Sequence, residues 1–284
     1  MIQQISILSG CILLLACTHI DRPKVLTSVE KEEFVSIQNE NNRTFQSILD
    51  SARVEGAILV YDPQTNHYQS NDFEWAAQGR LPASTFKIPN SIIALEEGIM
   101  EDENTVLEWD GTKRALSIWE KDMTFAEALR LSCVPCYQEI AQQIGVTKMQ
   151  DYLQKLHYQS MQFDENTIDD FWLIGASKIT LFEQINFLQR LYQGHLPIAA
   201  KTKQIIKKML VFKQTDTYTI SGKTGWAMRK NHNNAWFVGY VEKGSKVYYF
   251  ATNISPKKGF ELKDFPKTRM DVTLAALKKL QWLD

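Results

Sequence analysis

The 284-residue chain lacks an excess of basic residues, long apolar runs and a dense set of cysteines. Its 32 Lys and Arg residues are balanced by 33 Asp and Glu residues, and the net charge of −1 argues against a nucleic-acid-binding protein. With 13 Gly, 8 Pro and 4 Cys, the composition also excludes disordered, collagen-like and disulfide-scaffold proteins. Hydrophobic residues make up 44% of the chain, which is enough to bury the core of one large domain or two small ones.

The N-terminus carries one stretch that is apolar enough to meet a membrane, residues 5–16. This run is shorter than the roughly 20 residues that cross a hydrocarbon core, and it fits the apolar region of an export signal. Leu14, Leu15, Ala16 and Cys17 resemble a bacterial lipobox, in which the cysteine is lipidated. We therefore predict a signal peptide ending at Cys17 and an exported protein, periplasmic or anchored to the membrane through that residue. The alternative of an uncleaved apolar tail without lipid stays open, because no Lys or Arg precedes the run.

Cys133 and Cys136 are the cysteines that remain after this signal. A Cys-x-x-Cys pair can be redox-active or can form half of a zinc site. The sequence has no second such pair and its five His residues are scattered, so we expect no metal. Two small buried thiols are the favoured interpretation, and a local disulfide stays open because export leads to an oxidising compartment.

The spacing of apolar residues predicts strands at both ends of the chain and helices between them. A strand is expected at residues 56–62, with 67–70 as its hairpin partner. Helical spacing dominates from residue 84 to about 211, in these segments: 90–97, 124–131, 137–144, 149–156 and 180–193. The later elements are expected to be strands at 217–221, 234–241 and 246–254, with a tight turn at 242–245, and an amphipathic helix at 272–280.

These elements predict an α/β (α+β) fold with one antiparallel sheet shared by the early and late strands. N- and C-terminal helices flank the sheet, and residues 84–211 are inserted as an all-helical lobe. Residues 18–44 are expected to form a tether and the start of the first helix, and residues 45–284 the folded domain. A ligand site is expected at the interface of the two lobes.

Two serine motifs indicate nucleophilic chemistry. Ser84 and Lys87 form a Ser-x-x-Lys sequence at the start of a helical segment, where side chains three residues apart share one face. A serine hydroxyl is a poor nucleophile without a neighbouring base, and the lysine amine can supply one. Ser132, within the helical region, adds a hydroxyl that can relay protons.

A third motif, Lys223, Thr224 and Gly225, is expected directly after the strand at 217–221. The lysine and threonine can meet a substrate carboxylate, and the glycine lets the strand backbone approach a ligand closely. Each motif alone is common as an exposed Ser and Lys or as a turn. Their order along one chain is what indicates an active site.

Together the three motifs resemble the signature of serine β-lactamases and penicillin-binding proteins. The string Pro-Ala-Ser-Thr-Phe-Lys-Ile-Pro-Asn at 82–90, and Val134 where class A enzymes have Asn, are similar to class D, oxacillinase-type β-lactamases. Further matching segments are 132–141, 171–173, 223–226 and 236–239. The resemblance extends from about Glu55 to the C-terminus. Departures occur at 158–160 (Tyr-Gln-Ser) and at Ile174.

This resemblance implies hydrolysis of the β-lactam amide of penicillin-type antibiotics. It implies that Ser84 is the acylated nucleophile, that Lys87 is N-carboxylated (N6-carboxylysine) and acts as the general base, and that Ser132 carries a proton to the leaving nitrogen. Lys223 completes the catalytic set. CO2 or bicarbonate is needed to carboxylate the lysine, and no other cofactor is implied.

The resemblance also implies a substrate-binding set. Thr224 and Arg269 would bind the substrate carboxylate together with the lysine beside Thr224. Backbone N–H groups of Ser84 and of Trp226, the residue after Gly225, would hold the oxyanion. Because Arg269 precedes the predicted terminal helix, an ordinary surface charge is the alternative for this residue.

The family's lysine pocket corresponds to Phe86, Val134, Trp172 and Leu173, all apolar here. A dry environment lowers the pKa of a lysine and so permits reaction with CO2, and the Trp172 indole N–H can hold the product. Simple core packing is the alternative reading of these four residues.

Two other functions stay open on the sequence alone. One is a β-lactam-sensing module that remains acylated, and the other is a penicillin-binding peptidase. The expected partner is a small-molecule β-lactam, with no nucleic acid, and with a membrane only through the N-terminal lipid.

Overall fold

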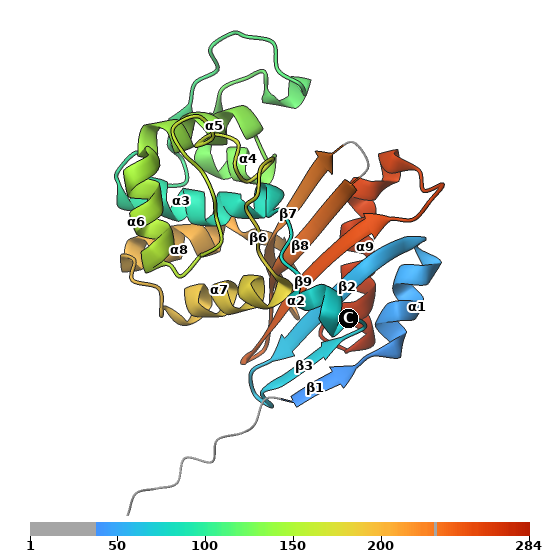
Figure 1. The fold of residues 1–284 in the computed structure, drawn as a ribbon. Helices are drawn as coiled ribbons and strands as arrows, with labels where there is room; N and C mark the ends of the chain where they lie inside the picture. The colour runs from blue at the N-terminus through green and yellow to red at the C-terminus, as the bar shows by residue number, and fades with distance from the viewer. Residues whose placement is uncertain (1–37, 230–231) are drawn as a thin grey trace, which may run out of the picture. The chain divides into compact units, whose positions relative to one another are not determined.

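The computed structural model describes residues 38–229 and 232–284. Its main sheet has the strand order β1-β3-β2-β9-β8-β7-β6 among these residues (Figure 1). The strands of this sheet are β1 (Gln38–Asn41), β2 (Val54–Asp62), β3 (His67–Ser70), β6 (Val211–Gln214), β7 (Thr219–Arg229), β8 (His232–Lys243) and β9 (Lys246–Pro256). A separate two-stranded ladder pairs β4 (Val106–Leu107) with β5 (Met123–Thr124).

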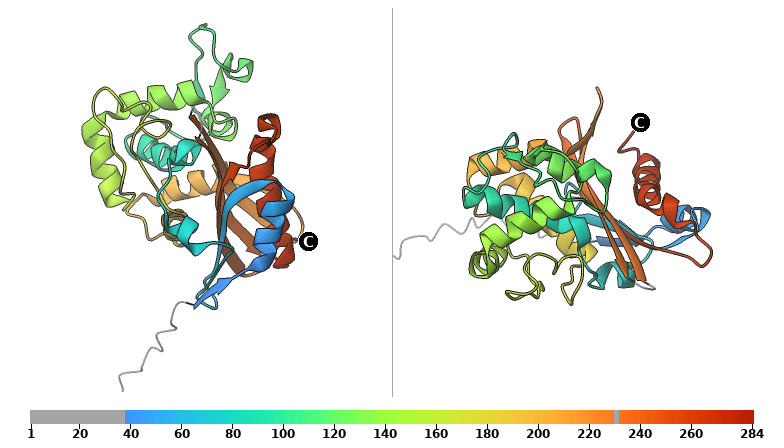
Figure 2. Two further views of the ribbon diagram at one scale, coloured as in Figure 1. Left: turned by 45° about the vertical axis from the view of Figure 1, so that its right-hand side comes forward. Right: turned by 90° about the horizontal axis from the view of Figure 1, so that it is seen from above.

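Helices lie on both faces of the sheet. The α-helices are α1 (Arg43–Ser51), α2 (Phe73–Ala77), α3 (Lys87–Glu96), α4 (Phe125–Arg130), α5 (Val134–Ile144), α6 (Val146–Lys155), α7 (Leu181–Gln193), α8 (Ala200–Met209) and α9 (Phe265–Lys279). Short 3-10 helices are η1 (Ala83–Phe86), η2 (Ser117–Trp119) and η3 (Leu262–Asp264). Helices α1 and α9 cover one face, and the lobe built from α3 to α8 lies on the other (Figure 2).

Burial along β8 explains this layering. Trp236, Val238 and Tyr240 belong to the core between the sheet and the helical lobe, whereas Phe237 and Val241 belong to the core under α1 and α9. Successive side chains of a strand point to opposite faces, so an unbroken apolar run fills both cores. The sheet is therefore the middle layer of three.

Local signals set the ends of two lobe helices. Thr124 and Glu127 form a reciprocal capping box at the start of α4, and Thr180 and Glu183 form another at the start of α7. Gly194, with φ of 79°, ends α7 in the left-handed conformation that glycine adopts without strain.

Most of the predicted elements are confirmed, including both hairpins, β2–β3 and β8–β9. Three expectations were wrong in detail. The sheet is not purely antiparallel, because β1 pairs with β3 in parallel. The Lys223–Gly225 motif does not follow a strand but lies inside β7, and Arg269 lies inside α9 instead of preceding it.

The predicted signal peptide and Cys17 lie outside the described residues. Within the described part of the chain, no helix combines the length and apolar character that crossing a membrane requires.

Candidate active site

Ser84 lies in η1, a turn that is held from three sides. The backbone N–H of Ala83, whose φ is 50°, donates to the carbonyl of Trp172 at 2.8 Å. The Thr85 hydroxyl donates to the Pro82 carbonyl at 2.7 Å and accepts from the buried Gln184 amide at 2.8 Å. Ser84 itself is 6% exposed. The nucleophile candidate therefore sits on a rigid, nearly buried turn.

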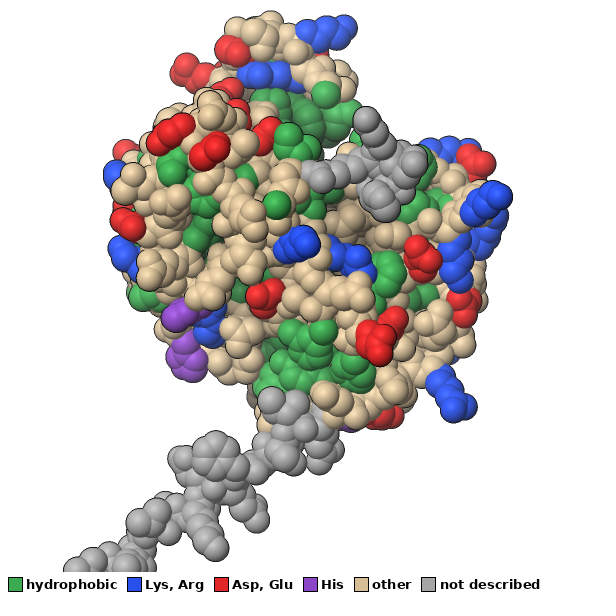
Figure 3. All heavy atoms as spheres, viewed as in Figure 1, with side chains coloured by type: hydrophobic (Ala, Val, Ile, Leu, Met, Phe, Trp, Pro, Cys, Tyr) green, Lys and Arg blue, Asp and Glu red, His purple; other side chains and the backbone are tan. Residues whose placement is uncertain are grey.

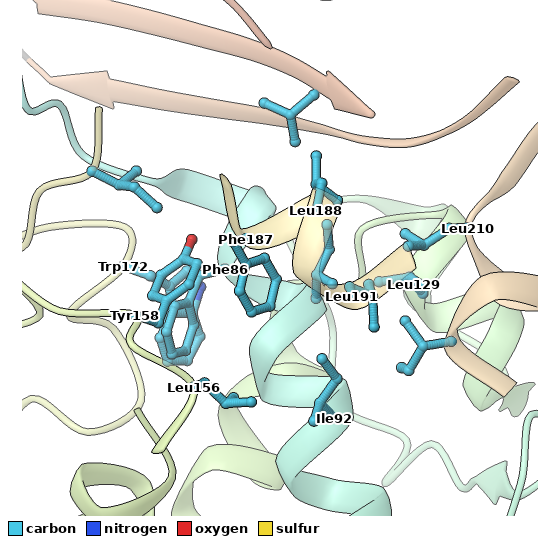
Figure 4. Packing of buried hydrophobic residues seen from close by; sticks show 14 of the residues in the cluster. Phe86, Ile92, Leu129, Leu156, Tyr158, Trp172, Phe187, Leu188, Leu191 and Leu210 are labelled. Carbon is cyan, nitrogen blue, oxygen red and sulfur yellow. The ribbon is translucent and has the colours of Figure 1, made fainter. Parts of the chain in front are cut away.

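Lys87 is the first residue of α3 and is fully buried (0% exposed) in an aromatic pocket. Its Nζ lies 4.5 Å from the centroid of the Tyr137 ring and 5.9 Å from that of Trp172. The rings of Phe86 and Trp172 stack at 5.4 Å, and Tyr158 meets Phe86 edge-on (Figure 4). Aromatic packing thus separates this amine from water.

Two polar atoms in this pocket lack partners. Neither the Nζ of Lys87 nor the indole Nε1 of Trp172 forms a hydrogen bond with any described residue, although both atoms are buried. Burial, and secondarily the charge of Lys223, hold the pKa of Lys87 well below its usual range. The low pKa favours the neutral form of this amine, and the unused indole donor of Trp172 belongs to the same pocket.

Of the other predicted pocket residues, Leu173 is half-buried and packs against the lobe core. Val134 opens α5, three residues before Tyr137, so both side chains share one face of that helix.

Ser132 and Lys223 come from opposite lobes and meet. Ser132 occupies the turn between α4 and α5 with φ of 52°, and Lys223 lies on β7. The lysine Nζ donates to Ser132 Oγ at 2.5 Å and to the Thr224 carbonyl at 3.0 Å. Burial, with the nearby charge of Arg269, lowers the pKa of Lys223 to about 7. This pair can therefore exchange protons near neutral pH.

Strand β7 passes directly beside the Ser84 turn. A Cβ placed on Gly225 would lie 3.2 Å from the backbone nitrogens of Ser84 and Thr85 and 3.1 Å from the Pro82 carbonyl. The Trp226 side chain points to the other face of the sheet, where its ring lies 6.0 Å from that of Phe265. Trp226 can therefore contribute its backbone to the site, whereas its indole ring lies on the opposite face of the sheet.

Arg269 reaches across from α9 to β7. Its Nη1 donates to the Gly225 carbonyl at 2.8 Å, its buried Nε has no partner among the described residues, and burial lowers its pKa to about 10. The alternative of a surface charge is thus wrong. Within the described part of the chain, Lys223 and Arg269 form no ion pair with a carboxylate, so this part of the site suits an anionic ligand.

Cys133 and Cys136 form a disulfide directly after Ser132. The structure thus corrects the interpretation of two free thiols. The described residues contain no cluster of three or more His, Cys, Asp or Glu side chains that could hold a metal ion.

Sequence reasoning missed two contributors. Tyr137 lies in the matched segment 132–141, but its ring was not assigned to the Lys87 pocket. Gln184 sits in the middle of α7, and no local motif links it to Thr85.

Comparison with known proteins decides the family. Residues 46–268 match the family described as the penicillin binding protein transpeptidase domain. Beta-lactamase OXA-5 of Pseudomonas aeruginosa is 38% identical over 216 residues, which cover 75% of this chain and 80% of that protein. The crystal structure of the class D β-lactamase YbXI from Nostoc is 36% identical and covers 86% of this chain and all of that one, with a TM-score of 0.81. The chain belongs to the class D β-lactamases.

Other class D β-lactamases agree with this. The Sebaldella termitidis enzyme structure is 34% identical with a TM-score of 0.82, covering 88% of this chain and all of that one. The C-terminal domain of the Bacillus licheniformis BlaR penicillin-receptor reaches a TM-score of 0.80 at 24% identity, covering 87% of this chain and 97% of its own, which shows a shared fold alone. The chain is thus a serine hydrolase of the class that acts on cyclic amides.

Proposed function

We propose that this enzyme hydrolyses the β-lactam amide of penicillin-type antibiotics through an acyl-enzyme at Ser84, with N-carboxylated Lys87 as general base. The observation that carries the proposal is the pair of unpartnered buried atoms, Lys87 Nζ and Trp172 Nε1, in one aromatic pocket. Only a neutral amine can add to CO2, and the low pKa of Lys87 supplies it.

Carboxylation of Lys87 fits this pocket chemically. The amine forms an N–C bond to CO2 and releases one proton, which leaves an anion that needs a buried donor. Trp172 offers such a donor in its indole N–H. When carboxylated, Lys87 supplies an anionic base able to accept protons in both halves of the reaction.

In the first half, Ser84 Oγ gives its proton to the carboxylated Lys87 and bonds to the lactam carbonyl carbon. The backbone N–H groups of Ser84 and Trp226 stabilise the oxyanion, which is the largest single contribution in many acyl transfers. The carbon–nitrogen bond then breaks, and Ser132 gives the ring nitrogen a proton that Lys223 can replace. In the second half, water attacks the ester, and Ser84 leaves with its proton restored.

Substrate binding is proposed to depend on charge. The substrate carboxylate would contact Lys223, the Thr224 hydroxyl and Arg269. No described carboxylate forms an ion pair with either of the two basic residues. Close approach of the β-lactam to the strand is favoured by Gly225, which lacks a side chain.

The lifetime of the acyl group on Ser84 tests this function. We expect intact-protein mass spectrometry to show rapid gain and loss of one benzylpenicillin in the wild type, and a persistent adduct in Lys87→Ala. Ser84→Ala, as the matched control, should gain no adduct. A persistent adduct in the wild type would instead identify a sensing module or a peptidase. Unchanged turnover in Lys87→Ala would exclude Lys87 as the general base.

Export and lipidation are proposed from the N-terminal sequence alone. Cys17 is predicted to carry a lipid, so palmitate labelling in a bacterial host should be lost in Cys17→Ala. Equal labelling of the variant and the wild type would contradict the anchor.

A further inference from the structure

A cleft of about 510 Å³ opens beside the Ser84 centre, and the proposed chemistry does not use it. It lies between the ends of β7 and β8 and two loop segments, 79–81 and 175–178. Its lining includes Arg80, Lys178 and Asn233. Lys and Arg side chains (blue) lie near the centre of the face shown in Figure 3, surrounded mainly by backbone and by side chains that are neither apolar nor charged (tan).

The two cations that line this cleft come from two chain segments joined by a β-bridge. Arg80 and Ile179 form an isolated antiparallel β-bridge, with backbone hydrogen bonds of 2.9 and 2.8 Å, and the Lys178 side chain lies over Gly79, the residue before Arg80. The Arg80 guanidinium lies 3.7 Å from the centroid of the Trp75 ring and donates one bond, of 3.2 Å, to Gln78. Stacking on the Trp75 ring therefore holds the Arg80 side chain in position.

Neither cation forms an ion pair with a described carboxylate. The buried Nε of Arg80 has no hydrogen-bond partner among the described residues. Asp72 and Glu55 are the carboxylates whose charge reaches Arg80, but neither forms an ion pair with it, and within the described ranges Lys178 has no ion pair either. Two unpaired cations with unused donors form a recognition site for a carboxylate, which arginine can bind with two parallel hydrogen bonds.

The cleft lies where a group attached to Ser84 would extend. Ala227 lines it and follows Gly225 by two residues on the same face of β7, about 7 Å along the strand. Gly225 in turn adjoins the Ser84 backbone nitrogen. Leu81, three residues before Ser84, lines the cleft from the other side. An acyl side chain attached to Ser84 and running along β7 would therefore point toward this cleft.

We infer that Arg80 and Lys178 bind a carboxylate on the acyl side chain of the β-lactam, so that side-chain-carboxylated penicillins are preferred substrates. This specificity site rests on the proposed acylation of Ser84. It is separate from the set around Lys223 and Arg269, which would bind the carboxylate on the β-lactam nucleus.

A matched pair of penicillins tests the inference. Carbenicillin differs from benzylpenicillin by one carboxylate on the side chain, so the ratio of their kcat/KM values isolates that group. We expect Arg80→Gln and Lys178→Met each to lower the ratio about tenfold, and the double variant to lower it further. Lys178→Arg, which keeps the positive charge, should show the wild-type ratio. Lys201→Met, which removes an exposed lysine of α8, should also leave the ratio unchanged. High salt should lower the wild-type ratio.

The outcomes separate the two proposals. If Ser84 is acylated by both penicillins and the double variant keeps the wild-type ratio, the specificity site is wrong while the proposed function stands. If neither penicillin forms an adduct at Ser84, the proposed function fails, and the specificity site fails with it. Arg80→Gln also removes the contact with the Trp75 ring and can therefore affect folding. If Arg80→Gln does not fold, the comparison of Lys178→Met with Lys178→Arg tests the specificity site.

Discussion

At the scale of single residues, the site depends on what surrounds two lysines. Lys87 is enclosed by aromatic rings, and burial holds its pKa well below the usual range, whereas Lys223 donates to Ser132 and has a pKa of about 7. The same residue type thus takes two roles because the surroundings differ. One lysine is suited to modification and the other to binding and proton exchange.

Trp172→Phe tests the role of the unpartnered indole N–H in the Lys87 pocket. The phenyl ring can retain the stack on Phe86, but the indole N–H is lost. Because a hydrogen bond to a charged group contributes about 1.5–3 kcal/mol, we expect the bicarbonate concentration for half-maximal nitrocefin turnover to rise at least about tenfold. An unchanged bicarbonate requirement, with an unchanged unfolding midpoint as the control, would contradict the role of this donor.

Lys223 should make stability depend on pH. Its pKa is about 7 in the fold and about 10.4 in an unfolded chain, so the unfolded state binds an extra proton between these values. The free energy of unfolding therefore rises with pH over this window. Urea denaturation at pH 7 and pH 9 should show a rise about 2 kcal/mol smaller in Lys223→Met than in the wild type. Equal rises would show that Lys223 is charged in the folded protein at pH 9.

At the scale of elements, β7 and the start of α5 bring the site together. The strand predicted from the sequence ends at residue 221, before Gly222 and before Gly225 of the Lys-Thr-Gly motif. In the structure both glycines lie within the strand, where a Cβ on Gly222 would come within 2.4 Å of the Val238 carbonyl. Close backbone packing, and not a turn, explains them.

The disulfide at the start of α5 should stabilise the turn that carries Ser132. Cys133 is the N-cap residue of α5 and is 1% exposed, and Cys136 lies one helical turn later. Closing so short a loop contributes about 2 kcal/mol at most in the chain-entropy description. Reduction should therefore lower the urea midpoint moderately and slow acylation of Ser84. A Cys133→Ala/Cys136→Ala double variant should show the same losses without reductant and no response to it; a response would point to an effect elsewhere.

At the scale of the whole molecule, the sequence predicts the layers of the fold and brings attention to the Ser84 and Lys87 pair. Ser84 lies in η1 and Lys87 opens α3, only three residues later, so spacing alone indicates their pairing. Hairpins β2–β3 and β8–β9 follow from local alternation and turn residues. These features depend on contacts within short segments of chain.

Contacts between distant segments could not be predicted in the same way. Tyr137 reaches Lys87 from another helix, Gln184 reaches Thr85 from α7, and Arg269 reaches Gly225 across the sheet. No periodicity connects such pairs, because they meet only once the lobe has packed on the sheet. The unpartnered atoms of the pocket likewise become visible only in three dimensions.

Carboxylation of Lys87 inside its aromatic pocket is tested most directly by 13C NMR of the enzyme in 13C-labelled bicarbonate. We predict one protein-bound carbamate resonance in the wild type, its absence in Lys87→Met, and its loss on acidification in step with nitrocefin turnover. Full turnover with no such resonance, or a resonance that persists in Lys87→Met, would contradict the mechanism.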